Sequence, residues 1–199
     1  MSRDDEVNQY SEDILKNPTL LPAVMNLACV HCRYVDNELD ISRTRVCPHC
    51  GKSGTRVLYR KYNVQHFLEL IQRLYTKNEP EAIVLVACAM LERLLEDLLI
   101  EMMEKHNLDD DAIDRKLKDF WRLDERAKKL FKAYSGKTLA QELSPAKGFW
   151  KIWKELRYKR DEFIHGRASV IIPSDGRKGF ELALNAEHIF SQIHNKYAC

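Results

Sequence analysis

Apolar residues recur every three or four positions through most of the chain, which is the spacing of one face of a helix. The first such stripe lies in residues 63–76, and Asn78-Glu79-Pro80 ends it. Residues 81–105 follow, and because their first half is apolar on every side, we expect this helix to lie at the centre of a bundle. The stripe of the first helix consists of Val64, Phe67, Leu68, Leu70, Ile71 and Leu74.

Three more helices complete the predicted bundle. One begins at Asp109-Asp110-Asp111, which supplies a cap and favourable charge at a helix start, and runs to about residue 134. The second covers about residues 146–165. Residues 168–180 contain Pro173 and Gly176 and are predicted to form a loop or hairpin before a last helix at about residues 182–197. The predicted fold class is therefore mainly α, a bundle of four or five helices.

Four of the six cysteines form two Cys-x-x-Cys pairs, Cys29 with Cys32 and Cys47 with Cys50, separated by fourteen residues. Two thiolates at this spacing can hold one face of a tetrahedral ion, and two such pairs close the site. The pattern resembles a zinc ribbon, with small β-strands expected in residues 38–46 and 55–59. Because four thiolates leave no open coordination position, the predicted zinc is structural and no catalytic metal is expected. The alternative is four unrelated buried cysteines.

The other candidate metal ligands are expected to play no part in this site. His31 and His49 lie inside the two pairs and are predicted to be exposed, although either can in principle replace a cysteine. Cys88 is predicted to be a small core residue, and no function is predicted for Cys199. The expected domains are residues 1–60, a short helix at 4–16 followed by the zinc ribbon, and residues 61–199, the helical bundle.

Charge and hydropathy exclude several classes of protein. The chain has 32 Lys+Arg and 30 Asp+Glu, so its formal net charge of +2 argues against binding a polyanion through overall charge. No apolar run approaches the roughly 20 residues that a bilayer requires. The polar, acidic start of the chain lacks the apolar segment of a signal peptide. We therefore expect a cytoplasmic protein without a membrane partner.

A cationic residue interrupts the apolar face of the helix predicted at residues 146–165. Arg160 falls on this face, and a guanidinium among apolar residues is costly unless it is paired. Asp161 and His165 are four residues apart on a flanking face, within mutual hydrogen-bonding reach. The apolar residues of the face are Phe149, Trp153, Leu156, Phe163 and Ile164.

Arg160-Asp161-x-x-x-His165 resembles the R-x4–6-H motif of the HEPN superfamily, in which a polar residue follows the arginine. Residues 82–95, with their Leu91-Glu92 pair, resemble the apolar first core helix of such bundles. The motif is short, and Arg60 to His66 also falls within the R-x4–6-H range by chance. The resemblance implies a metal-independent endoribonuclease that works as a homodimer on RNA, as a toxin or antiviral-defence effector, with an antitoxin or other regulatory protein as a further partner.

The resemblance also implies roles for single residues. His165 would move a proton at the ribose 2′-oxygen or the leaving 5′-oxygen, and Arg160 would hold the scissile phosphate. Asp161 would orient the imidazole or secure Arg160, and Glu92 is a candidate polar partner from the preceding core helix. We expect a basic surface along the same helix to bind the RNA backbone, with Arg157, Lys159 and Arg167 as its substrate-binding residues and Lys151 and Lys154 beside them.

Other interpretations of these residues stay open. Arg160 can be a structural residue paired with an acidic residue of another helix, with His165 exposed at the helix end. The basic residues can equally form an ordinary solvated helix face, and the aromatic residues nearby can belong to the core. In that case the chain is a non-catalytic adaptor that binds nucleic acid or protein. A nucleotide-binding module is a third possibility.

Overall fold

The computed structural model describes residues 27–29, 31–32, 34–36, 46–53, 56–58, 62–146, 148–167 and 169–199 of the chain. The helix predicted at residues 4–16 lies outside these residues. In the part that is described, no helix is both long and apolar enough to cross a membrane.

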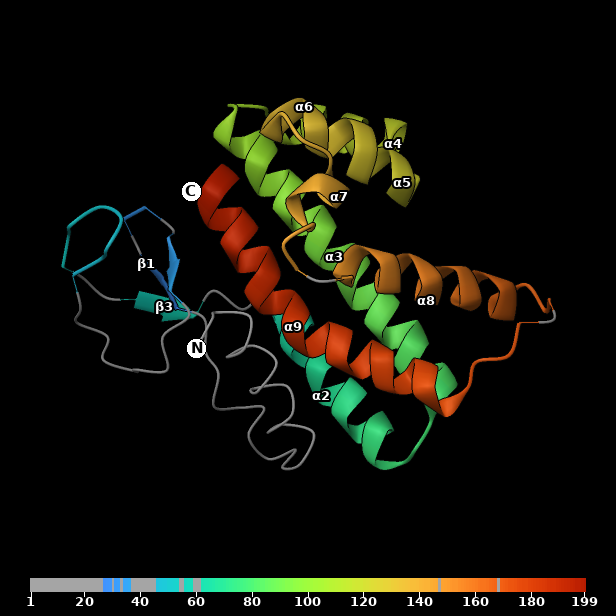
Figure 1. The fold of residues 1–199 in the computed structure, drawn as a ribbon. Helices are drawn as coiled ribbons and strands as arrows, with labels where there is room; N and C mark the ends of the chain where they lie inside the picture. Colours follow the sequence, from blue (N-terminus) through green and yellow to red (C-terminus); the bar gives the residue numbers. More distant parts are fainter. Residues whose placement is uncertain are drawn as a thin grey trace.

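The protein is mainly helical, as predicted, and α3 runs through its centre (Figure 1). The helix α3 is flanked by α2 and α9, while α8 crosses it and the short helices gather at one end. The helical elements are α2 (Tyr62–Thr76), α3 (Pro80–Lys105), α4 (Asp110–Asp119), α5 (Leu123–Glu125), the π-helical segment η2 (Arg126–Leu130), α6 (Phe131–Ser135), α7 (Leu139–Glu142), α8 (Phe149–Ile164) and α9 (Pro173–Tyr197).

The core forms around α3 because its apolar residues face every neighbouring helix. Ile71 of α2, Trp153 of α8 and Phe180 of α9 all lie in this core and are almost inaccessible to solvent. Cys88 is fully buried in α3, where it packs as a small apolar residue, as the sequence predicted. Burial raises the pKa of its thiol to about 12, so the thiol stays neutral.

The third predicted helix does not run unbroken to residue 134. The helix α4 ends at Asp119, and the chain turns at Phe120 before α5 begins at Leu123. The side chain of Arg126 donates hydrogen bonds to the carbonyl oxygens of Phe120 (2.8 Å) and Leu117 (3.2 Å). These bonds satisfy backbone groups that a continuing helix would have paired, so the side chain of Arg126 stabilises the break. Trp121 is left strongly exposed at this turn.

The last helix, α9, begins at Pro173, so the loop or hairpin predicted over residues 168–180 is wrong for most of its length. Pro173 occupies the first turn, where it is well tolerated, and the Asp175 carboxylate accepts a hydrogen bond from the backbone N–H of Ile172 (3.1 Å). Gly176 sits where α9 meets α3, and a Cβ at this position would come within 2.7 Å of Pro80. The glycine therefore permits close helix packing rather than a turn.

The described N-terminal residues form a small antiparallel sheet of β1 (Leu27–Cys29), β2 (Val35–Asp36) and β3 (Arg56–Leu58) in the order β2-β1-β3. The strand predicted at residues 55–59 corresponds to β3. Most of the strand predicted at residues 38–46 lies outside the described residues, although Val46 pairs with Ser53 in an isolated bridge. The strand β2 contacts α9, and a hydrogen bond between Cys199 and Cys32 also joins the two regions.

Candidate functional site

The four cysteines of the predicted metal site lie together. The Cys29 and Cys50 Sγ atoms are 3.8 Å apart, those of Cys32 and Cys47 are 3.7 Å apart, and all four lie within 4.8 Å of one another. A tetrahedral zinc ion with Zn–S bonds of about 2.3 Å places its sulfur ligands about 3.8 Å apart. The four thiols are therefore arranged to bind one ion such as zinc.

Tight turns bring each cysteine pair to this geometry. The backbone N–H of Gly51 donates to the carbonyl of Cys47 (2.9 Å), and Gly51 has a φ of 69°, which glycine adopts without strain. The N–H of Cys29 bonds the carbonyl of Tyr34 (2.9 Å), closing the first pair's turn. His49 stays exposed, as predicted, and its ring stacks on Tyr34 with the ring centres 5.4 Å apart.

The local hydrogen bonds favour thiolate at one of these cysteines. Burial alone raises the pKa of Cys29, but backbone hydrogen bonds at His31 and Cys32 outweigh it and bring the pKa to about 7. Burial raises the pKa of Cys32. A bound cation would stabilise the thiolate form of all four ligands, because metal binding to cysteine releases the proton.

Arg160 lies at a polar break in the packing between α8 and α3. Its Nη1 donates to Glu92 Oε1 of α3 at 2.8 Å, and its Nε and Nη2 donate to Asp161 Oδ1 at 3.0 and 2.8 Å. The pKa of Arg160 is lowered by burial and raised by the bonds to Asp161 and the charge of Glu92, with a net increase. The guanidinium is therefore a fixed, charged group, 15% exposed, between two carboxylates.

A second arginine extends this cluster. The Arg157 guanidinium lies 3.5 Å from Asp124, 3.8 Å from Glu92 and 3.9 Å from Asp161. Its Nε is buried and has no hydrogen-bond partner among the described residues. We call Glu92, Asp124, Arg157, Arg160 and Asp161 the α8 ionic cluster.

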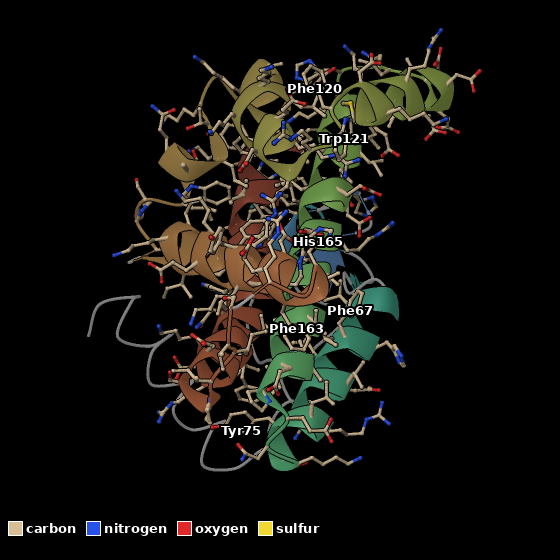
Figure 2. All side chains as sticks on the ribbon, turned by 90° about the vertical axis from the view of Figure 1, so that its right-hand side faces the viewer. Phe67, Tyr75, Phe120, Trp121, Phe163 and His165 are labelled. Carbon is tan, nitrogen blue, oxygen red and sulfur yellow. The ribbon has the colours of Figure 1, made fainter. Side chains whose placement is uncertain are left out.

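His165 follows α8 directly and is exposed (Figure 2). Its backbone N–H bonds the carbonyl of Asp161 (3.1 Å), which fixes the helix end. In the part of the chain described, no hydrogen bond or ion pair joins the His165 ring to Arg160 or Asp161. The structure thus brings Arg160, Asp161 and Glu92 together and leaves the imidazole open to solvent one turn further on.

The apolar face predicted on α8 is buried only in its first half. Phe149, Trp153 and Leu156 are buried, but Phe163 is 42% exposed and Ile164 is 59% exposed. The sequence predicted that these five residues share an apolar face, and the structure buries the first three of them and exposes the last two. His165 therefore lies beside exposed apolar side chains (Figure 2).

Each predicted substrate-binding residue has an acidic partner. Arg157 belongs to the α8 ionic cluster, Lys159 lies 2.6 Å from Asp175, and Arg167 lies 3.0 Å from Glu162. Three exposed lysines, Lys151, Lys154 and Lys178, line a groove between α8 and α9 together with Tyr158.

One residue at the metal site has no signal in the sequence. Cys199 follows α9, and its Sγ lies 2.8 Å from the carbonyl oxygen of Cys32 and 3.9 Å from His49 Nδ1. An isolated cysteine far along the chain carries no spacing pattern, so only the tertiary structure places it here.

No family model matches the chain, and neither a curated protein nor a solved structure matches it. The resemblance to the HEPN superfamily therefore rests on the motif residues in the sequence alone.

Proposed function

We propose that the protein is a metal-independent endoribonuclease of HEPN type that carries a structural zinc ribbon. The observation that supports this function is the arrangement at the end of α8: Arg160 is fixed between two carboxylates, and His165 is exposed one turn later. A fixed cation and an exposed imidazole at the same end of one helix can serve phosphodiester cleavage, since the reaction needs a phosphate ligand and a group that moves protons.

The proposed reaction uses the RNA itself as nucleophile. His165 takes the proton of a ribose 2′-hydroxyl, and the 2′-oxygen forms a bond to phosphorus while the bond from phosphorus to the 5′-oxygen breaks. The leaving 5′-oxygen takes a proton from a second imidazole that is protonated at the start. The products are a 2′,3′-cyclic phosphate and a 5′-hydroxyl. Asp161 is 42% exposed, so the scissile phosphate replaces it at the Nε and Nη2 of Arg160 while Glu92 keeps Nη1.

A homodimer would supply the second imidazole that this scheme uses. Exposed apolar side chains near His165 favour such an interface, because large apolar surfaces on a soluble domain mark contact sites. Phe163 and Ile164 end α8, and Val170 and Ile172 follow it, all strongly exposed. Ile164→Asp is expected to shift the protein to the monomer in light scattering, whereas a monomeric wild type would contradict the dimer.

The test of the function is cleavage of labelled RNA by purified protein in excess chelator. His165→Ala is expected to lower the rate about 10²–10⁴-fold and Arg160→Lys about 10²–10³-fold, with unchanged circular dichroism. His66→Ala is the matched control and is expected to cleave at the wild-type rate. His66 is exposed on α2 and belongs to the chance motif match with Arg60. A single 2′-deoxy nucleotide at the cleaved position is expected to block the reaction. Equal cleavage by all variants would identify a contaminating nuclease and overturn the proposal.

A non-catalytic adaptor is the second candidate, and the α8 ionic cluster favours it. Two carboxylates already oppose the charge of Arg160, and Arg157, Lys159 and Arg167 are paired as well. RNA binding without cleavage, unaffected by His165→Ala, would establish the adaptor. If the protein is a nuclease, we also propose a role as a toxin or defence effector with a regulatory protein partner. Growth arrest when the wild type is expressed, and normal growth when His165→Ala is expressed, would support this role.

We propose a zinc ribbon for the N-terminal residues because four thiols at tetrahedral spacing lie beside a small antiparallel sheet. Elemental analysis is expected to find zinc in the wild type and to find it lost in Cys29→Ser. A folded, metal-free protein would contradict this assignment.

A further inference from the structure

Cys199 reaches the cysteine cluster from the helical bundle. It follows α9, whereas the cluster belongs to the N-terminal residues, so two distant parts of the sequence meet at this point. The thiol of Cys199 donates to the carbonyl oxygen of Cys32 at 2.8 Å, and the sulfur gives up this bond when it binds a metal ion as a thiolate. Lys105, at the end of α3, donates to the carbonyl oxygen of Cys199 and holds the residue in place.

Cys199 also completes a second set of metal ligands. The ligand atoms of Cys32, His49 and Cys199 all lie within 4.8 Å of one another, and Cys199 Sγ is 3.9 Å from His49 Nδ1. A zinc ion with bonds of about 2.3 Å to sulfur and about 2.0 Å to nitrogen places two such ligands about 3.5 Å apart. The Cys199–His49 pair therefore needs an adjustment of a few tenths of an ångström to bind one ion, and Cys32 has to move by at most about 1 Å to join them.

The two ligand sets share Cys32 but have different centres. One comprises Cys29, Cys32, Cys47 and Cys50, and the other adds His49 and Cys199, which lie outside the first set. One ion cannot reach all six ligands, whereas a thiolate sulfur has enough lone pairs to bridge two ions. Four thiolates around one divalent cation also leave two surplus negative charges, which attract a second cation.

We propose that Cys32, His49 and Cys199 form a second zinc site that links the N-terminal cysteine cluster to the end of α9. Cys32 bridges the two ions, and His49 and Cys199 complete three protein ligands. The fourth position stays open to water or a small exchangeable anion, so this ion dissociates more readily than the ion held by four cysteines. The second site is independent of the proposed nuclease, since no residue of the α8 ionic cluster takes part in it.

The test is the number of zinc ions bound per chain by the full-length protein, measured by native mass spectrometry at saturating zinc. The wild type is expected to bind two ions per chain, and a weak chelator is expected to remove one of them. Cys199→Ser and His49→Ala are each expected to bind one ion, which the weak chelator does not remove. His31→Ala is the matched control, because His31 is an exposed histidine at the equivalent position of the other cysteine pair, and its removal is expected to leave both ions bound.

Cobalt as a replacement ion gives a second readout. The second equivalent of cobalt is expected to add thiolate-to-metal charge-transfer absorption in the wild type and none in Cys199→Ser. One ion in the wild type at saturation would overturn the second site. Two ions in the wild type, Cys199→Ser and His49→Ala alike would show an adventitious ion only. No bound ion at all would contradict the zinc ribbon as well.

Discussion

The cysteine cluster and the helical bundle are stabilised by different means. Among the described side chains of residues 27–58, the buried ones are Cys29 and Cys47, both candidate metal ligands. The bundle instead buries large apolar side chains around α3, such as Trp153, Phe131 and Leu95. A region with few buried apolar groups depends on ligation for its fold, whereas the bundle depends on burial and packing. The two regions should therefore respond to different perturbations.

Removing the metal is expected to have the largest effect, and the effect should be confined to the cluster. Binding of structural zinc contributes on the order of 10–16 kcal/mol in small zinc peptides, so a strong chelator or Cys29→Ser with Cys50→Ser should unfold the N-terminal residues. Proteolysis should then cut before residue 60 while far-ultraviolet circular dichroism keeps its helical signal. Loss of the helical signal on chelation would show that the bundle also depends on the metal.

The reciprocal change is Trp153→Ala in α8. Trp153 is completely buried, so its removal should lower the free energy of unfolding by about 3–5 kcal/mol, measured in urea, without changing zinc content. Trp153→Phe is the matched control. Since the indole Nε1 is buried without a hydrogen-bond partner in the described structure, phenylalanine removes that unpaired donor and should cost less than alanine. Equal losses for both variants would contradict this packing.

Gly176→Ala probes the contact between α9 and α3. The added Cβ would lie 2.7 Å from the Cα and Cβ of Pro80, so the helices must separate, at a cost of about 1–3 kcal/mol. Gly179→Ala is the control, because its nearest contact is Ile83 at 3.4 Å and alanine favours helix by about 1 kcal/mol. In thermal denaturation, Gly179→Ala should have a higher melting temperature than Gly176→Ala. The opposite order would contradict the close contact between Gly176 and Pro80.

The smallest effect is expected from Asp175→Asn, and it depends on pH. Burial raises the pKa of Asp175, but the bonds from Lys159 and Ile172 outweigh it and hold the pKa below its ordinary value. The ionised form therefore stabilises the fold above the unfolded pKa, and this contribution disappears as pH falls through the lower folded pKa. Asparagine keeps the bond to Ile172 and loses the charge, so we expect a loss of about 1 kcal/mol at pH 7 that begins to decline below about pH 4 and vanishes below the folded pKa. A loss that is as large at pH 2 as at pH 7 would show that the charge is not responsible.

The sequence predicted the features that local spacing determines. The two Cys-x-x-Cys pairs predicted the metal cluster, and helical periodicity predicted the mainly α fold with α3 at its centre. Tertiary contacts determined what was missed. Gly176 indicates a turn until its contact with Pro80 is known, and the side chain of Arg126 stabilises a break that periodicity does not reveal.

The same limit applies to the candidate site. The position of Arg160 on an apolar stripe predicted that it needs a partner, and Glu92 and Asp161 are the residues that contact it. Sequence reasoning could not find Cys199, because no pattern connects it to Cys32. The roles of Arg160, His165, Asp161 and Glu92 in RNA cleavage stay predictions until the variants are assayed.

The three tryptophans occupy three different environments, which makes the protein's own fluorescence a sensor. Trp153 is buried, Trp150 is half-buried and Trp121 is 74% exposed. Trp121 lies above His165 on the face shown in Figure 2. Acrylamide should quench Trp121 first, and RNA or a second copy bound over His165 should shield it from the quencher. A change in the emission of the unlabelled protein would then report binding at this face, while Trp153 reports whether the core stays intact.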